Sequence, residues 1–219
     1  MNENKQRIVI IEDHPMVREH LVLLINKEPD LEVSGEADNV QQGKELIRST
    51  VPQLAIVDLT LKDGSGLDLI KGLKSLSIPT PVLVFSMHDE SLYAERALRA
   101  GAKGYITKDQ GSREVLAAIR RVLGGDVYVS EKMVSNVLKK LTSSGNEGLR
   151  PRPVDCLSDR ELTVLELIGR GLASRAIAET LNIGVATVDT YRARIKEKLN
   201  IETAFELHDF AIRWFREGD

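Results

Sequence analysis

The sequence of 219 residues contains a single cysteine and no long apolar run. One cysteine, Cys156, excludes an intramolecular disulfide and a cysteine-based metal cluster, which fits a reducing compartment. No segment approaches the roughly 20 apolar residues that a membrane-spanning helix needs. The apolar run over residues 8–11 is also too short for the core of a signal peptide. We therefore expect a cytoplasmic protein that does not contact a membrane.

Neither sign of charge dominates the sequence. It has 30 Lys and Arg residues against 33 Asp and Glu residues, a net charge of -3. Composition alone therefore does not indicate a nucleic-acid or membrane-surface protein. What the chain does have is a hydrophobic fraction of 42%, which is ordinary for a globular protein and enough for buried cores. The length suits one large domain or two small ones.

Up to about residue 125, short apolar runs alternate with longer amphipathic stretches. We expect strands over residues 8–11, 31–37, 54–57, 81–85 and 104–107, and helices over 15–27, 40–48 and 112–123, with two more ending near residues 75 and 101. The strands are apolar throughout, as burial on both faces requires. The pattern predicts an α/β fold with a doubly wound, five-stranded parallel sheet.

After about residue 125 the sequence predicts one more helix, then a linker, and then a helical domain. Residues 130–141 predict a sixth helix, and residues 142–155 predict a flexible linker because they are rich in Ser, Gly and Pro. Four short helices are then expected, over residues 158–170, 174–181, 185–199 and 203–216. Ser158 and Glu161 form a capping-box pattern, and Ser174 is the expected N-cap of the second helix. The predicted domains are 1–127, a helix and linker over 128–156, and a small all-α domain over 157–219.

Polar side chains follow four of the predicted strands in the first domain. They are Glu12, Asp13, Asp58, Ser86 and Lys108. The carboxyl ends of parallel strands meet at one edge of a sheet, so these side chains are expected to converge. Clustered carboxylates suit Mg²⁺. With the ion in place, Asp58 can attack a phosphoryl group whose oxygens contact Lys108 and Ser86.

A simpler interpretation exists for each of these residues alone. A single Asp at the end of a strand is usually a turn residue or a helix cap. Tyr105, three residues before Lys108, can be an ordinary half-buried aromatic on an edge strand. The joint pattern of carboxylates, hydroxyl and lysine favours a site over these separate explanations.

Four segments together resemble the receiver domain of bacterial two-component response regulators, a flavodoxin-like fold. They read IVIIEDHPMVREHL, IVDLTLKDGSGLDLI, VLVFSMHD and GAKGYITKD. The resemblance implies that Asp58 is the phosphoacceptor and that Mg²⁺ is held by Glu12, Asp13, Asp58 and the backbone carbonyl of Thr60. It also implies that Ser86 and Tyr105 are the switch residues and that Lys108 contacts the phosphate.

The sequence departs from the receiver pattern at two places. Glu12 stands where many relatives carry Asp, and Lys62 and Asp63 replace a common Met-Pro pair after the phosphoacceptor. Thr60 and His88 occupy positions at which the family tunes dephosphorylation. The departures bear on loop geometry and leave the nucleophile in place.

In the third helix of the C-terminal domain, Val188, Tyr191, Ile195 and Leu199 are spaced to face a core. A helix, a tight turn and a second helix form the helix-turn-helix arrangement, whose second helix enters the major groove. Residues 151–219 contain 10 basic and 12 acidic residues, a net charge of -2, so composition does not support DNA binding. Residues 185–199 alone carry four basic and two acidic residues.

Residues 157–212 resemble the LuxR-type DNA-binding domain, and with a receiver they resemble the NarL/FixJ class of transcription regulators. The motif reads LSDRELTVLELIGRGLASRAIAETLNIGVATVDTYRARIKEKLNI. The resemblance implies a recognition helix over residues 187–198. The implied DNA-binding residues are Thr187, Asp189, Thr190 and Ala193 toward the bases, and Arg175, Arg192, Arg194, Lys196 and Lys198 toward phosphates. Asp189 stands where relatives often carry lysine, which predicts an unusual site preference or weaker binding.

The sequence thus predicts a non-enzymatic transcription regulator. The resemblance implies that a sensor histidine kinase phosphorylates Asp58 and that phosphorylation controls homodimerisation and binding to promoter DNA, with RNA polymerase as a further partner. One alternative is an aspartyl-phosphate phosphatase, although Thr60 stands where a second catalytic carboxylate is expected. Another is a protein-interaction module with one inactive half. In the last helix, Leu207, Phe210, Ala211 and Trp214 either pack in the core or pair two DNA-binding domains.

Overall fold

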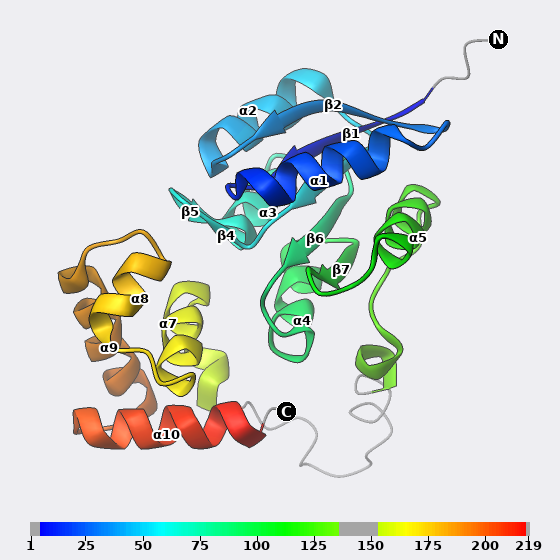
Figure 1. Ribbon diagram of the computed structural model, residues 1–219. Helices are drawn as coiled ribbons and strands as arrows, with labels where there is room; N and C mark the ends of the chain where they lie inside the picture. The colour runs from blue at the N-terminus through cyan, green and yellow to red at the C-terminus, as the bar shows by residue number, and fades with distance from the viewer. Residues whose placement is uncertain (1–4, 136–152, 218–219) are drawn as a thin grey trace. The chain divides into compact units, whose positions relative to one another are not determined.

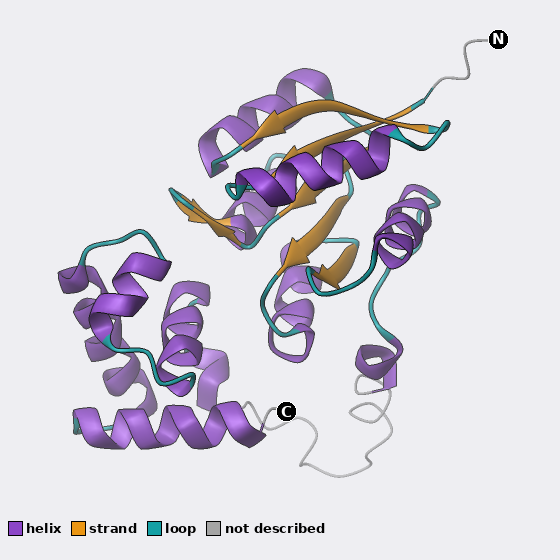
Figure 2. Cartoon of the chain, viewed as in Figure 1, coloured by secondary structure: helices purple, strands orange, loops and turns teal. Residues whose placement is uncertain are grey.

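The protein is described by a computed structural model over residues 5–135 and 153–217 (Figure 1). The chain divides into two compact units, residues 1–138 and residues 139–219, and each unit is described by itself. Strands and helices alternate in the N-terminal unit, whereas the C-terminal unit is helical (Figure 2). This agrees with the predicted α/β domain followed by a small all-α domain.

The N-terminal unit is built on a five-stranded parallel sheet with the order β2-β1-β3-β6-β7. The strands are β1 (Gln6–Ile11), β2 (Leu31–Ala37), β3 (Leu54–Val57), β6 (Val82–Ser86) and β7 (Gly104–Thr107). The short strands β4 (Thr60–Leu61) and β5 (Gly64–Ser65) form an antiparallel hairpin. The helices are α1 (Pro15–Asn26), α2 (Val40–Thr50), α3 (Gly66–Ser75), α4 (Glu90–Ala100) and α5 (Ser112–Leu123). The predicted doubly wound sheet is confirmed.

Helices cover both faces of this sheet (Figure 2). Ile8, Ile10, Leu83 and Phe85 belong to one buried cluster with side chains of α1 and α5. The intervening strand residues point to the opposite face, where α2, α3 and α4 lie. The central strands β3 and β6 are buried along their whole length, so their residues are apolar up to Ser86, the last residue of β6, whereas the edge strand β2 carries the polar residues Glu32, Ser34 and Glu36.

The N-terminal unit extends beyond its predicted end at residue 127. The N–H of Tyr128 donates to the carbonyl of Lys103 at 3.0 Å, and its carbonyl accepts from the N–H of Tyr105 at 2.8 Å. Residues 131–135 are helical and Met133 is buried, while the rest of the predicted helix over 130–141 lies outside the described residues. Tyr128 therefore continues the edge of the sheet beside β7, one residue beyond the predicted domain end.

The C-terminal unit is a set of short helices around one small core. It contains the 3-10 helix η1 (Pro153–Cys156) and the helices α7 (Asp159–Gly169), α8 (Ser174–Thr180), α9 (Val185–Leu199) and α10 (Ala204–Glu217). Val154 of η1 is buried, so the predicted linker over 142–155 is wrong at its C-terminal end, and residues 142–152 lie outside the described residues. In the described parts of the chain, every helix is too short or too polar to span a bilayer.

The caps of α7 and α8 differ in how well the sequence predicted them. The capping box of α7 is confirmed, because Ser158 N–H donates to Glu161 Oε2 at 2.7 Å and Glu161 N–H donates to Ser158 Oγ at 3.4 Å. The predicted cap of α8 is wrong, because Ala173 holds the N-cap position and Ser174 is the first helical residue. The Ser174 hydroxyl is therefore available to another acceptor.

The core face of α9 is only partly as predicted. Val188 and Ile195 are fully buried, but Tyr191 and Leu199 are half-buried. In α10, Leu207 and Ala211 are fully buried, whereas Phe210 and Trp214 are half-buried. Two of the four predicted residues of each helix therefore form the core, because each helix lies at the surface of a small domain.

Candidate functional site

Four of the polar side chains that follow the strands of the N-terminal unit, Glu12, Asp13, Asp58 and Lys108, come together at one edge of the sheet. Lys108 Nζ lies 2.6 Å from Glu12 Oε2 and 2.8 Å from Asp58 Oδ2. Glu12 is 1% exposed and Asp58 is 3% exposed. Ser86 is fully buried at the end of β6, and Asp13 is half-buried beside Glu12. The result is a buried acidic pocket with one cation.

Backbone hydrogen bonds between neighbouring strands fix this pocket. Asp58 N–H donates to the carbonyl of Ile11 at 2.9 Å, and Glu12 N–H donates to that of Ala37 at 3.0 Å. Lys108 N–H donates to the carbonyl of Ser86 at 2.9 Å. The ladder of the sheet thus continues one residue past each strand, which holds the carboxylates and the lysine at one edge.

Burial decides the electrostatics of the pocket. It raises the pKa of Glu12, the neighbouring Asp58 carboxylate raises it further, and Lys108 offsets only part of the rise. Burial lowers the pKa of Lys108, but the carboxylates of Asp58 and Glu12 more than reverse this, so its pKa lies above the ordinary value. Lys108 therefore stays protonated, and the pocket has an excess of carboxylates over cations.

The pocket has the chemistry of a site for a hard divalent cation. Glu12, Asp13, His14 and Asp58 each offer a ligand atom, and these atoms lie within 4.8 Å of one another. Asp58 Oδ1 is buried and has no hydrogen-bond partner among the described residues. A buried carboxylate oxygen without a donor is costly unless a cation occupies its other side. The arrangement fits Mg²⁺.

Sequence reasoning missed His14 in this cluster. Its Nδ1 lies 3.1 Å from Glu12 Oε1 and 2.9 Å from Asp13 Oδ1, and the side chain is 65% exposed. The available signal was the position of His14 immediately after the acidic pair. One nitrogen of the exposed ring thus contacts both carboxylates.

His88 contacts residues from several elements around the pocket. Its Nε2 lies 2.8 Å from Thr60 Oγ1, and its N–H donates to Ser86 Oγ at 3.3 Å. Tyr105 is completely buried, and its hydroxyl donates to the carbonyl of His88 at 2.9 Å. The simpler interpretation of Tyr105 as a half-buried edge aromatic is therefore wrong. The ring of His88 also stacks on that of Tyr93, with centroids 4.5 Å apart.

The unusual loop residues Lys62 and Asp63 anchor the β4–β5 hairpin. Lys62 forms an ion pair with Asp38, and Asp63 Oδ1 accepts from the N–H of Val40 at 2.7 Å. Both contacts reach the start of α2. Thr60 begins this hairpin two residues after Asp58. Lys62 and Asp63, although they differ from the common Met-Pro pair, thus hold the loop after Asp58 in place through these two contacts.

A second candidate site lies on α8 and α9. The predicted DNA-binding side chains there are all exposed or half-buried. Lys198 is committed to an ion pair, with Nζ 2.6 Å from the buried Glu161 Oε2, and Arg175 pairs with Glu179 at 3.4 Å. Neither Arg192 nor Arg194 has a carboxylate partner in the described part of the chain. Among the predicted phosphate-contacting residues, these two guanidinium groups have no side-chain partner within residues 5–135 and 153–217.

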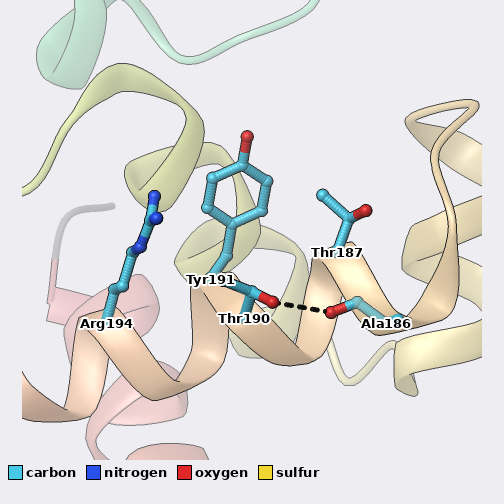
Figure 3. Close-up of a pocket in the computed structure, with 5 residues that line it drawn as sticks. All are labelled: Ala186, Thr187, Thr190, Tyr191 and Arg194. Carbon is cyan, nitrogen blue, oxygen red and sulfur yellow. Dashed lines mark hydrogen bonds between the residues drawn. The ribbon is translucent and has the colours of Figure 1, made fainter.

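Part of α9 forms an open hollow of about 290 Å³. It is lined by Ala186, Thr187, Thr190, Tyr191 and Arg194. Figure 3 shows Thr187, Tyr191 and Arg194 projecting from one side of the helix, while the Thr190 hydroxyl donates to the carbonyl of Ala186 at 2.9 Å. The half-burial of Tyr191 therefore places an aromatic ring at the helix surface.

A doubly wound α/β domain with a buried acidic pocket, joined to a helix-turn-helix domain, defines a two-domain signalling protein. The model of the response regulator receiver domain matches residues 8–120, and that of the bacterial regulatory proteins of the luxR family matches residues 155–211. The chain belongs to the response regulators that combine these two domains, and it is a transcription regulator.

Three comparisons extend over nearly the whole chain. The transcriptional regulatory protein MctR of Rhizobium johnstonii is 33% identical over 95% of this chain and 94% of its own. The oxygen regulatory protein NreC of Staphylococcus carnosus is 31% identical over 94% of this chain and 97% of its own. The structure of RcsB from Salmonella enterica serovar Typhimurium has a TM-score of 0.61 at 22% identity and covers 95% and 98% of the two chains. These matches include both domains.

Proposed function

We propose that the protein accepts a phosphoryl group on Asp58 from a sensor histidine kinase and that this controls dimerisation and promoter binding. The observation that carries the proposal is the buried Asp58 carboxylate, with Oδ2 held by Lys108 and Oδ1 without a donor. An Asp58 oxygen forms a bond to phosphorus as the phosphorus–nitrogen bond of a phosphohistidine breaks, and the imidazole keeps the electron pair.

Mg²⁺ is the proposed cofactor of this reaction. Glu12, Asp13, Asp58 and the backbone carbonyl of Thr60 would hold it. When bound, the ion supplies positive charge that offsets the carboxylates and the phosphoryl oxygens. Lys108 leaves its present carboxylate partners to donate to the transferred group, and the Ser86 hydroxyl donates to a second oxygen.

The proposed switch transmits the charge change through Ser86, His88 and Tyr105. Ser86 Oγ accepts from His88 N–H, and Tyr105 donates to the His88 carbonyl, so a shift of the Ser86 hydroxyl toward phosphate alters both bonds. His88 precedes α4, and its ring stacks on Tyr93 of that helix. A local charge event thereby biases the position of α4 and the surface around it.

The phosphorylation proposal is tested by intact mass after incubation with acetyl phosphate and Mg²⁺. We expect the parent chain to gain the mass of one phosphoryl group and Asp58→Asn to gain none, because the amide is not a nucleophile toward phosphorus. Asp68→Asn is the matched control, since Asp68 is an exposed carboxylate on α3. An adduct that persists in Asp58→Asn, or its absence from the parent, contradicts the proposal.

The C-terminal unit is proposed to bind double-stranded promoter DNA through α9, working with RNA polymerase in the cytoplasm. The structure of RcsB bound to promoter rprA supports this, because that protein has the same fold. We assign Thr187, Asp189, Thr190 and Ala193 to the base edges, and Arg175, Arg192, Arg194 and Lys196 to phosphates. Lys198 would have to leave Glu161 to reach a phosphate.

Dimerisation is proposed to involve α10, the last helix of the C-terminal unit. Phe205 in its first turn is 80% exposed, which is unusual for so large an aromatic side chain. Leu207 and Ala211 are fully buried and unavailable for a partner. Phe205, with the half-buried Phe210 and Trp214, is therefore the proposed contact surface between two copies.

Phosphate contact by Arg194 predicts a specific change in salt dependence. Replacing Arg194 by Ala removes one counterion-releasing contact, so we expect the slope of log affinity against log salt to fall in magnitude by about 0.9. Titration of a labelled promoter fragment at several salt concentrations measures this. Lys71→Ala on α3 removes one exposed charge from the other domain and should leave the slope unchanged. An unchanged slope in Arg194→Ala contradicts the assignment.

A further inference from the structure

The recognition helix carries a carboxylate that is held in place by the preceding helix. Ser174 Oγ donates to Asp189 Oδ1 at 3.1 Å. Ser174 is free to do so because Ala173, not Ser174, is the N-cap of α8. This hydrogen bond joins the first residue of α8 to the second turn of α9. It therefore fixes the Asp189 side chain relative to both helices of the motif.

No cation neutralises Asp189 in the described part of the chain. Its only side-chain partner there is the neutral hydroxyl of Ser174, and Asp189 is exposed. Thr190, the next residue, turns its hydroxyl to the carbonyl of Ala186 and does not compete for the carboxylate. Among the described residues only Oδ1 of Asp189 has a hydrogen-bond partner, so Oδ2 can accept from a group outside the protein.

A carboxylate next to DNA is selective because most groups of the major groove repel it. The phosphates are negative, and guanine presents the acceptors N7 and O6. Adenine offers its N6 amino donor only beside the acceptor N7, and thymine offers an acceptor and a methyl group. Cytosine presents its N4 amino donor without a neighbouring acceptor on the same base. The chemistry of Asp189 thus fits cytosine better than the other bases.

We propose that Ser174 is a positioning residue that orients Asp189 to accept a hydrogen bond from the N4 amino group of a cytosine in the major groove. The inference rests on the proposed DNA-binding function and names the base chemistry of that site. Ser174 contributes by restricting the rotamers of Asp189, so less conformational freedom is lost when the base is bound. It also turns the carboxylate toward the α8 side of the motif.

The proposal separates base preference from general affinity. Ser174→Ala leaves the charge of Asp189 in place, so repulsion from phosphate and non-specific affinity stay the same. Preference for cytosine falls because the carboxylate is no longer oriented. Asp189→Ala removes both the preference and the repulsion, so its non-specific affinity rises. Ser174→Thr retains a hydroxyl and should restore the preference of the parent.

The test is selection of binding sites from random duplex DNA by the full chain, followed by titration of the selected duplex. Two changes are made at one position of each half-site. In the first, the selected C·G pair is replaced by T·A. In the second, the cytosine is replaced by N4-methylcytosine, which still pairs with guanine but carries a methyl group in place of the amino hydrogen that faces the major groove. For the parent, each change should weaken binding by at least about fivefold, the lower end for a mismatched base pair. For Ser174→Ala the loss should shrink severalfold, and for Asp189→Ala it should vanish.

Thr180→Ala is the matched control, because Thr180 also lies on α8 and its hydroxyl donates to the carbonyl of Ala176 within that helix. It should keep the preference of the parent. If the parent selects no sequence at all, the DNA-binding function itself fails. If the parent selects sites but Ser174→Ala keeps its full preference, or the position read is not cytosine, the Ser174–Asp189 inference is overturned while DNA binding stands.

Discussion

Gly66→Ala is expected to destabilise the N-terminal domain by about 3 kcal/mol or more, at the upper end for forcing extra volume into a packed site. A Cβ on Gly66 would lie 2.0 Å from the carbonyl oxygen of Asp58 and 3.0 Å from the Cα of Leu59. These are backbone atoms, and a side-chain rotation cannot move them away. Gly66 N–H also donates to the carbonyl of Leu59 at 2.9 Å, so the two segments are held together. The proposed phosphoacceptor must therefore shift, and phosphorylation should fall as well.

Gly72→Ala is the control in the same helix. A Cβ at Gly72 meets no atom within 4 Å, so this substitution should stabilise α3 by roughly 0.5–1 kcal/mol through lower entropy of the unfolded chain. Urea unfolding followed by far-UV circular dichroism, with hydrogen exchange of β3 amides, measures both variants. The only tryptophan, Trp214, lies on α10, so its fluorescence shows whether the C-terminal domain is unaffected. Equal stability of the two variants would contradict the close approach of Gly66 to Asp58.

Glu161→Ala should destabilise the C-terminal domain by about 2–4 kcal/mol, since it removes a helix cap and one partner of a partly buried ion pair. Glu161 is 3% exposed, and its Oε2 accepts from Ser158 N–H at 2.7 Å and from Lys198 Nζ at 2.6 Å. The side chain of Lys198 is 39% exposed, so solvent screens part of this attraction. The cap, the start of α7 and the end of α9 all depend on this one carboxylate.

The pH dependence of this effect has a definite sign. Burial raises the pKa of Glu161, but the hydrogen bonds from Lys198 and Ser158 outweigh it, so the pKa lies below the ordinary value of 4.5. A lowered pKa in the folded state means that the stabilisation is present above the unfolded value and is lost as pH falls through the folded value. The difference between parent and Glu161→Ala should therefore shrink on acidification below about pH 4.

Trp214 fluorescence in urea measures this difference at neutral and acidic pH. Glu179→Ala is the control, because Glu179 is 73% exposed and its pair with Arg175 lies on the surface of α8. It should change stability by no more than about 0.5 kcal/mol. A destabilisation by Glu161→Ala that is the same at both pH values would show that the charge of Glu161 is not involved.

Much of the fold follows from local patterns in the sequence. The predicted bounds of β2, β3, β7, α5 and α9 are those of the structure, because each is an apolar run or amphipathic stretch with clear boundaries. The convergence of Glu12, Asp58 and Lys108 was predictable too, since parallel strands with buried faces bring their carboxyl ends to one edge. Composition, by contrast, gave no sign of a DNA-binding domain, because the net charge of residues 151–219 is -2.

The sequence by itself thus determined the order of elements, the acidic pocket and the helix-turn-helix, because periodicity and strand ends are local properties of the chain. Only the tertiary structure decided which partner each polar side chain takes. Ser174 bonds to Asp189 instead of capping α8, and Lys198 is held by Glu161. Residues 15 and 37 positions apart in the chain form these contacts. Such pairings depend on how helices pack, and packing places side chains by distance in space, which sequence spacing does not encode.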